Sequence, residues 1–204
     1  MTDLKLKICG VRDQGVELSG LEPDFLGFIF YPKSPRNFRG SIEGLNPDVK
    51  RVGVFVNEQP EQILELVQKH NLDVIQLHGE ESVKECELLR ENAEIWKVFG
   101  VDSEFDFEHL SPYLKAVDKF LFDTKSEARG GTGISFNWAK LKEYHLDKPF
   151  ILSGGIGPNH AKELKGLSKA LPQMCGIDIN SRFEIEPGIK DIELVKRFID
   201  ELSR

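Results

Sequence analysis

At 204 residues, with 40% hydrophobic and 30% charged residues, the sequence has the size and composition of one globular domain and is too rich in core-forming residues for a disordered chain. Its formal net charge of −7 argues against a nucleic-acid partner, since nucleic-acid-binding domains usually carry a basic surface. The first residues lack the apolar stretch of a signal peptide, and no later apolar run reaches the length of a membrane span. We therefore expect a cytoplasmic protein with no membrane partner.

The cysteine pattern points to the same compartment. Cys9, Cys86 and Cys175 are odd in number and widely spaced, which fits neither a disulfide framework nor a zinc site. In a reducing cytosol, a free thiol can serve as a reagent. No cluster of His with Asp or Glu repeats at metal-ligand spacing, so we expect no metal.

Short apolar runs of strand length alternate with segments of helical periodicity along the chain. The predicted strands are residues 4–9, 25–30, 51–56, 73–78, 95–99, 119–123, 150–153 and 175–179. Helical periodicity is clearest in PEQILELVQKHN, SVKECELLREN, FNWAKLKEYHL, PNHAKELKGL and DIELVKRFIDEL. Strands that alternate with helices are parallel, and eight such units predict an α/β fold, a single (β/α)8 TIM barrel that spans residues 1–204 as one domain.

Alternation within the strands favours the barrel over a doubly wound open sheet. Helices cover both faces of an open parallel sheet, so its strands should be apolar on both faces. Here one face is apolar and the other becomes polar towards the carboxyl end, where a barrel has its active site. The residues expected to face inward are Lys5, Lys7 and Cys9 on the first strand and Gln76 and His78 on the fourth. On the sixth strand they are Leu121 and Asp123, and on the eighth Gly176, Asp178 and Asn180. No Rossmann GxGxxG motif follows the first strand.

Two of these strand ends carry reactive groups, Cys9 and Asp123. A free cysteine is most often a buried structural thiol, but Lys5 and Lys7 share the strand face of Cys9, and a nearby ammonium lowers the pKa of a thiol. Asp123 precedes the glycine-rich segment TKSEARGGTGI, which is typical of a mobile loop over an active site. Burial there would raise the pKa of Asp123. The alternative role for Asp123 is to cap a helix or turn.

The segments after the seventh and eighth strands have the features of a phosphate site. Gly154 and Gly155 follow the seventh strand in ILSGGIGPNH, and Asp178, Asn180 and Ser181 belong to IDINS at the end of the eighth. Glycines let the backbone approach an anion, and helix N-termini present free N–H groups to it. Phosphate sites of barrel enzymes form from these two segments.

Three further side chains are expected at the mouth of the barrel. Arg36 lies in YPKSPRNF after the second strand, where its guanidinium could bind a carboxylate through two hydrogen bonds or be solvated. Gln76 and His78 would come from the fourth strand, although a lone histidine is more often structural than catalytic.

Seven motifs of the sequence resemble those of phosphoribosylanthranilate isomerases, which are enzymes of L-tryptophan biosynthesis. In chain order, these motifs are KICGVRD, GFIFYPKSPR, RVGVFVN, DVIQLHGEE, FLFDTKSEARGGTG, ILSGGI and GIDINSRFEIEPGIKD. The resemblance covers essentially the whole chain. It implies an Amadori rearrangement that converts N-(5-phosphoribosyl)anthranilate to 1-(2-carboxyphenylamino)-1-deoxyribulose 5-phosphate. It also implies that Asp123 is the general acid at the ring oxygen and that Cys9 is the general base at C2′.

By the same resemblance, Arg36 binds the anthranilate carboxylate and Gly154, Gly155, Asn180 and Ser181 bind the phosphate. The implied partner is the small-molecule phosphosugar-anthranilate substrate, with no cofactor or metal. We expect a monomer, with a homodimer as the alternative. The sequence departs from the family at Arg182, where many members have a glycine, and this arginine either contacts the phosphate or points to solvent.

Two other functions fit parts of the sequence. Another phosphate-binding barrel enzyme would share the phosphate segments, but an indole-glycerol-phosphate synthase needs a lysine acid with glutamates, and a pentose-phosphate epimerase needs a His/Asp metal set. Lys97, which faces inward on the fifth strand, could be such a lysine, so the synthase stays an alternative. A barrel that only binds a ligand or a partner would be expected to have lost Cys9 or Asp123, and both are present.

Overall fold

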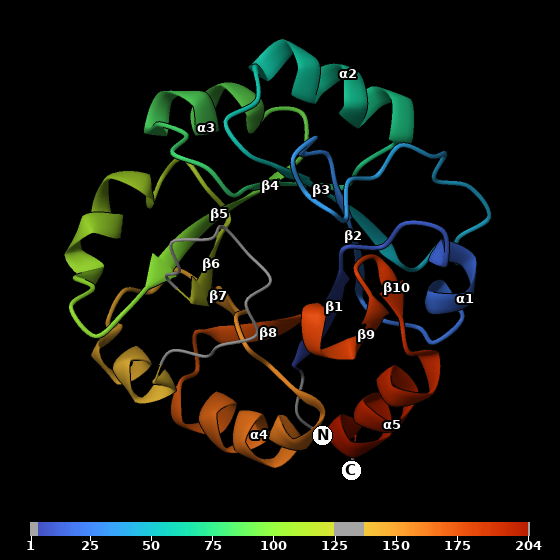
Figure 1. Cartoon of the computed structure of the whole chain (residues 1–204). Helices are drawn as coiled ribbons and strands as arrows, with labels where there is room; N and C mark the ends of the chain where they lie inside the picture. The colour runs from blue at the N-terminus through green and yellow to red at the C-terminus, as the bar shows by residue number, and fades with distance from the viewer. Residues whose placement is uncertain (1–3, 125–136, 204) are drawn as a thin grey trace.

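The computed structural model describes residues 4–124 and 137–203. Its eight parallel strands pair in chain order, and the last pairs with the first to close a barrel that is surrounded by helices (Figure 1). The strands are β1 (Lys5–Cys9), β2 (Phe25–Ile29), β3 (Lys50–Phe55), β4 (Val74–Leu77), β5 (Glu94–Val101), β6 (Lys119–Thr124), β7 (Phe150–Leu152) and β8 (Met174–Ile179). The predicted barrel is confirmed, and each predicted strand is present to within two residues at either end.

The connections between strands are less regular than the strands. The α-helices are α1 (Gly15–Ser19), α2 (Pro60–His70), α3 (Val83–Leu89), α4 (Ala161–Ala170) and α5 (Ile192–Ser203). Short 3-10 helices cover Phe107–Tyr113, Trp138–Glu143, Pro158–His160 and Ser181–Phe183. No helix of the described residues is long and apolar enough to cross a membrane.

One predicted helix is wrong in type. The segment FNWAKLKEYHL forms only the 3-10 helix Trp138–Glu143 in its described part. The backbone of Tyr144 is extended, with ψ 112°, and its hydroxyl donates a 2.6 Å hydrogen bond to the carbonyl of Lys148. The chain therefore leaves the helix at Tyr144, before β7 begins at Phe150.

The longer helices begin and end where the sequence provides caps. Pro60 occupies the first turn of α2, where its missing N–H has no intrahelical partner to lose, and Asn71 ends the helix in the left-handed conformation with φ 48°. Ser82 and Glu85 form a reciprocal capping box at the start of α3. These local signals explain why the two helices were found correctly from the sequence.

The core has two layers, one inside the barrel and one between the barrel and its helices. In β4, for example, Ile75 and Leu77 belong to the outer layer, whereas Val74 belongs to the inner one and Gln76 is buried on the same strand face. The inner layer consists of Cys9, Phe25, Val52, Val54, Val74, Trp96, Val98, Leu121 and Ile151. The predicted alternation of inward and outward residues is therefore confirmed.

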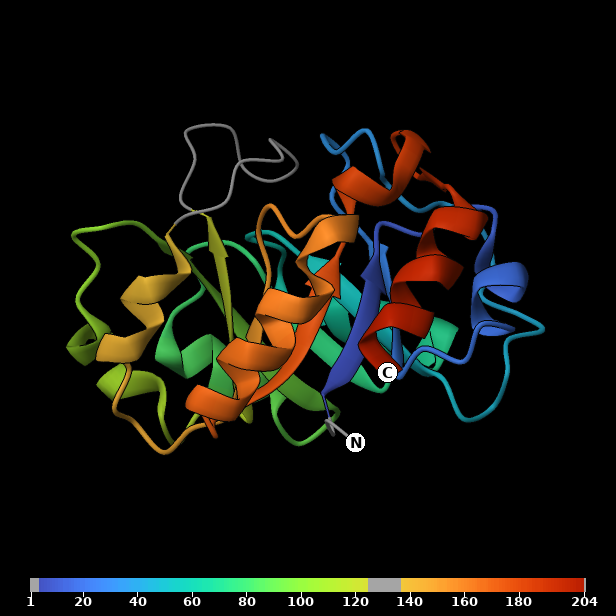
Figure 2. The same ribbon diagram turned by 90° about the horizontal axis from the view of Figure 1, so that it is seen from below.

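An antiparallel hairpin of two strands follows β8. The sequence patterns did not predict this hairpin. It consists of β9 (Glu184–Glu186) and β10 (Ile189–Lys190). Figure 2 shows it at the same end of the barrel as the segment between β2 and β3. This hairpin brings two charged side chains, Glu184 and Lys190, to the mouth of the barrel.

At the opposite end, three aspartates tie neighbouring strands together. Each directly precedes an even-numbered strand and accepts a hydrogen bond from a backbone N–H near the start of the preceding odd-numbered strand. Asp24 bonds Leu6 at 2.8 Å, Asp73 bonds Arg51 at 2.7 Å, and Asp118 bonds Ile95 at 2.8 Å. A charged acceptor strengthens each of these hydrogen bonds.

We predict that Asp118→Ala lowers the free energy of unfolding by about 1–3 kcal/mol, because the half-buried N–H of Ile95 loses its acceptor. Thermal unfolding should show a melting temperature lower by about 2–4 °C per kcal/mol. Asp118→Asn keeps an acceptor and should lose less, and Asp200→Ala, at an exposed site of α5, is the control. Equal melting temperatures for Asp118→Ala and Asp200→Ala would contradict this role of Asp118.

Candidate active site

The carboxyl ends of the strands bring together ionisable groups that are far apart in the sequence. Cys9 ends β1 and is buried, and Asp178 lies next to it on β8. The ammonium of Lys7 donates a 2.9 Å hydrogen bond to Asp178, and both side chains are buried. Asp123 reaches the same mouth from β6. The inward placement predicted for these residues is correct.

The thiol of Cys9 is in a less ionised state than its lysine neighbours suggested. Burial raises the pKa of Cys9 above its ordinary value, although the nearby ammonium of Lys7, and to a lesser extent that of Lys190, act to lower it. The predicted net lowering is therefore wrong, because desolvation of the thiolate outweighs the attraction of the ammonium groups. Lys5 takes no part, since it is half-exposed and pairs with Asp24 at 2.9 Å.

Asp123 behaves as expected from the sequence. Burial raises the pKa of its carboxyl, while the backbone N–H of Thr124 and the charge of Lys7 oppose this effect. The N–H of Thr124 donates a 2.7 Å hydrogen bond to Oδ1, so the carboxyl also makes the local cap that was the structural alternative. The predicted loop TKSEARGGTGI lies, after Thr124, outside the described residues.

His78 lies beside Asp123 but is neutral. Its Nε2 is 3.5 Å from Oδ2 of Asp123, which is longer than an ordinary hydrogen bond. Burial lowers the pKa of His78 to about 4, and the nearby charges of Lys97 and Lys7 act in the same direction. At neutral pH the imidazole can therefore donate or accept a hydrogen bond but adds no positive charge to the site.

Gln76 contributes an acceptor with no partner. The side chain is 1% exposed, and its Oε1 makes no hydrogen bond within the described structure. A buried carbonyl oxygen without a partner is costly, so its persistence at the mouth is typical of a binding position.

Arg36 does bind a carboxylate, but a carboxylate of the protein. Its Nε and Nη2 donate hydrogen bonds of 2.9 and 2.6 Å to the two oxygens of Glu184. Lys190 donates to the same carboxylate at 2.7 Å and to the side-chain oxygen of Asn180 at 2.8 Å. Burial acts to raise the pKa of Glu184, but Arg36 and Lys190 lower it overall and keep the carboxylate ionised.

The two segments expected to bind phosphate lie at the same end. Gly154 and Gly155 both have positive φ, 81° and 65°, which glycine adopts without strain. A Cβ on Gly154 would lie 2.5 Å from the backbone nitrogen of Thr124, so only glycine fits there. Arg182, which follows Ser181, extends from the segment after β8 across to Gly157 after β7. A Cβ on Gly157 would lie 3.1 Å from its Cδ.

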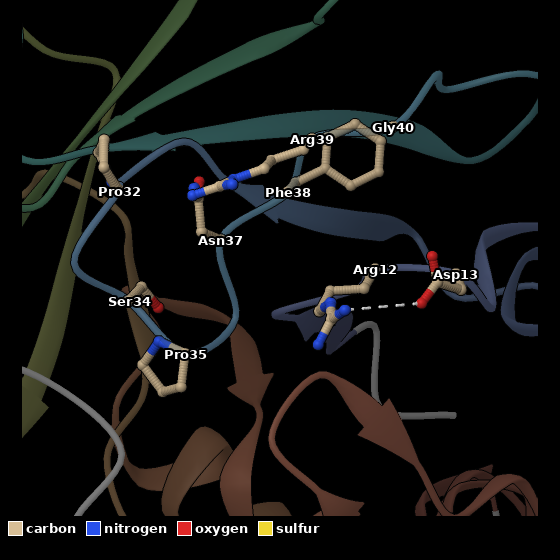
Figure 3. Close-up of a pocket in the computed structure, with 9 residues that line it drawn as sticks. All are labelled: Arg12, Asp13, Pro32, Ser34, Pro35, Asn37, Phe38, Arg39 and Gly40. Atoms are coloured by element: carbon tan, nitrogen blue, oxygen red, sulfur yellow. Dashed lines mark ion pairs between the residues drawn. The ribbon is translucent and has the colours of Figure 1, made fainter.

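A separate hollow of about 320 Å³ is formed by the segments that follow β1 and β2 (Figure 3). It is lined by Arg12, Asp13, Pro32, Ser34, Pro35, Asn37, Phe38, Arg39 and Gly40. None of the predicted site residues lines it. Within residues 4–124 and 137–203, no three His, Cys, Asp or Glu side chains are grouped in a way that could hold a metal ion.

The model of the N-(5'phosphoribosyl)anthranilate (PRA) isomerase family matches residues 6–201 of this chain. The chain belongs to that family. It is 40% identical over 208 residues to the N-(5'-phosphoribosyl)anthranilate isomerase of Parabacteroides distasonis, with 97% of this chain and 92% of that protein covered. The protein is thus an isomerase of tryptophan biosynthesis, as the sequence motifs implied.

Solved phosphoribosylanthranilate isomerases have the same fold. The structure from Thermus thermophilus superposes with a TM-score of 0.86 at 29% identity and covers 98% of both chains. A second isomerase, solved with reduced 1-(o-carboxyphenylamino)-1-deoxyribulose 5-phosphate, gives a TM-score of 0.80 at 32% identity and the same coverage.

Membership of the isomerase family also removes the reason for considering a synthase. Lys97, the inward lysine of β5, is buried and bound by Glu81 at 3.1 Å and by the carbonyl of Gly79 at 2.8 Å. It therefore stabilises the neighbouring turn and is not a free acid. Sequence reasoning missed Glu184 and Lys190 as parts of the site, and the only signal for them was their place in the motif FEIEPGIKD.

We predict that His78 stays neutral down to strongly acidic pH and titrates near pH 4, because burial disfavours the imidazolium and protonation would place a cation beside Lys97 and Lys7. The exposed His145, next to Glu108 and the carbonyl of Glu143, has its pKa raised and serves as the internal control. Histidine side-chain NMR signals recorded from pH 8 to pH 3.5 measure both. A midpoint for His78 near the ordinary value of about 6.5 would refute the electrostatic description of the mouth.

Proposed function

We propose that this isomerase converts N-(5-phosphoribosyl)anthranilate to 1-(2-carboxyphenylamino)-1-deoxyribulose 5-phosphate, with Asp123 as general acid and Cys9 as general base. The observation that carries the proposal is the convergence of these two groups on the mouth of a barrel whose sequence belongs to the isomerase family. The solved relative with a bound reduced form of this product supports the choice of substrate.

The chemistry needs one group that donates a proton and one that removes a proton. Asp123 would protonate the furanose ring oxygen as the C1′–O bond breaks, which leaves a protonated imine between C1′ and the anthranilate nitrogen. Cys9 would then remove the proton from C2′, and the C2′–H electrons would form the enol-amine. Tautomerisation of the enol-amine to the ketone completes the rearrangement. The return of one proton from Cys9 to Asp123 through solvent restores the starting state of the enzyme. The ring opening and the tautomerisation thus need only acid–base chemistry, and no cofactor or metal is required.

The mechanism requires Cys9 as a thiolate and Asp123 as a neutral carboxylic acid. This state holds the same number of protons as thiol with carboxylate, so the two forms differ only in where one proton resides. Burial raises the pKa of both groups. This favours the neutral acid at Asp123 but disfavours the thiolate at Cys9, which must therefore be stabilised by local positive charge.

Arg36 would bind the anthranilate carboxylate. Glu184 occupies its Nε and one side of Nη2, which leaves Nη1 and the outer N–H of Nη2 to face a ligand. Glu184 thereby fixes the guanidinium plane, and Lys190 keeps Glu184 ionised and in place. The fork of Arg36 would then approach the substrate end-on.

The remaining site residues would hold the phosphorylated sugar. Backbone N–H groups at Gly154, Gly155, Asn180 and Ser181 would bind the phosphate. Their segments lie next to each other because β7 pairs with β8. Gln76, His78 and Asp178 would contact the substrate hydroxyl groups, with Oε1 of Gln76 as an acceptor that has no protein partner.

We place this activity in a single domain of residues 1–204 that acts in the cytoplasm. A monomer suffices, because every proposed site residue comes from one barrel. A homodimer is the alternative, since the phosphoribosylanthranilate isomerase of Thermotoga maritima is a dimeric relative, 32% identical to this chain.

We predict that Cys9→Ala and Asp123→Asn each lower kcat by about 10²–10⁴, the usual contribution of a general acid or base. The loss of phosphoribosylanthranilate fluorescence measures the rate. Cys175→Ser, at a half-buried thiol outside the mouth, is the matched control and should keep nearly full activity. Wild-type-like activity in either of the first two variants would remove that residue's role, and an inactive wild type would overturn the proposed function.

We also predict that Arg182→Ala raises KM for the phosphorylated substrate roughly two- to tenfold with little change in kcat. The side chain lies against Gly157, between the two segments expected to bind phosphate, where its charge would add to their N–H groups. Arg197→Ala, on the exposed face of α5, is the control. An unchanged KM would show that Arg182 does not contact the phosphate.

A further inference from the structure

Cys9 and Lys7 share a space that exists because residue 27 is a glycine. The register between β1 and β2 places Cys9 beside Gly27, and side chains of the same face of β1 converge there. A Cβ on Gly27 would lie 3.0 Å from Sγ of Cys9 and 3.0 Å from Nζ of Lys7. The ammonium and the thiol therefore meet over the bare backbone of β2.

The ammonium of Lys7 is fixed in that position. It bonds Oδ1 of Asp178 at 2.9 Å, and the two side chains are only 1% and 5% exposed. Strand pairing reinforces the contact, because Lys7 and Asp178 are register partners on β1 and β8. Burial acts to lower the pKa of Lys7, but Asp178 and Cys9 raise it overall, so the group stays charged.

The other charges that act on Cys9 are Asp178 on β8 and Lys190 on β10. Lys190 is committed to Asn180 at 2.8 Å and to Glu184 at 2.7 Å. Asp178 opposes a thiolate, since negative charge on its carboxylate raises the pKa of Cys9. Lys7 is therefore the cation in direct reach of the thiol, and it is screened from water.

We propose that Lys7 is a positioning residue for Cys9: held by Asp178 over Gly27, its ammonium is the counter-charge against which the Cys9 thiolate forms. The inference rests on the proposed role of Cys9 as base and explains how a buried thiol can serve in that role. A purely structural lysine would stabilise the barrel without any effect on the ionisation of the thiol.

Two substitutions should move the ionisation of Cys9 in opposite directions. Lys7→Met removes the charge but keeps most of the volume, and it should raise the pKa of Cys9 by about 1 or more, with a roughly tenfold smaller thiolate fraction at a given pH. Asp178→Asn keeps the lysine but removes the nearby anion, so it should lower the pKa of Cys9. Loss of a packing contact alone would not produce shifts of opposite sign.

The measurement is a pH titration of the cysteine ¹³Cβ signals by NMR in the wild type and in both variants. Cys175 is the internal control, since neither Lys7 nor Asp178 acts on its pKa. A Cys9 pKa unchanged by Lys7→Met would overturn the proposal. If Lys7→Met does not fold, Lys7→Gln decides, because its amide can still donate a hydrogen bond to Asp178 but carries no charge. A higher Cys9 pKa in Lys7→Gln supports the role of Lys7, and an unchanged or lower one refutes it.

The activity of the same variants separates this inference from the proposed function. If Cys9 is the base, kcat/KM rises with pH as the thiolate forms. The midpoint of this rise should then shift in Asp178→Asn and Lys7→Met by as much as the Cys9 pKa measured by NMR. If Cys9→Ala stays active, the proposed function fails, yet the NMR titration still tests whether Lys7 controls the thiol.

Discussion

The ion pair between Lys7 and Asp178 is the interaction on which the site depends. It joins β1 to β8 where the barrel closes, and it puts a charged ammonium into a space from which water is excluded. Because charges are weakly screened in such a space, one lysine acts on Cys9, Asp123 and His78 together. The charge of Lys7 acts to lower the pKa of all three groups, and burial is the larger influence on each pKa.

A second charged cluster lies next to the first. It orients the side chain of Arg36 and does not act mainly on the ionisation of Cys9 or Asp123. Glu184 is held by Arg36 and Lys190, and both cations reach it from different parts of the chain. Removing one partner of such a buried cluster would leave an uncompensated charge, so loss of any one of the three side chains should destabilise the other two. The hairpin of β9 and β10 is therefore more than a connection, since it fixes the arginine that faces the proposed anthranilate carboxylate. In the proposed mechanism, protons would be transferred at the first cluster and the ligand carboxylate would bind at the second.

The strands and the inward faces could be read from the sequence because both depend on local patterns. Alternation with a period of two placed Cys9, Asp123 and Asp178 on the inner face, and the caps of α2 and α3 marked their ends. The helix predicted in FNWAKLKEYHL failed because the chain becomes extended at Tyr144, whose hydroxyl bonds the carbonyl of Lys148, and apolar periodicity does not reveal such a turn. The hairpin was missed because strands of three and two residues have too few positions for a period of two to show.

The sequence by itself determined the barrel, the residues at its mouth and the isomerase family, since order along the chain and side-chain alternation carry that information. The tertiary structure alone decided the charge state of the site. Whether Lys7 or Lys5 reaches Cys9 depends on the register of β1 against β2 and β8, and on a glycine at position 27. Whether burial or the ammonium dominates the thiol depends on how completely water is excluded, and no pattern along one strand encodes that.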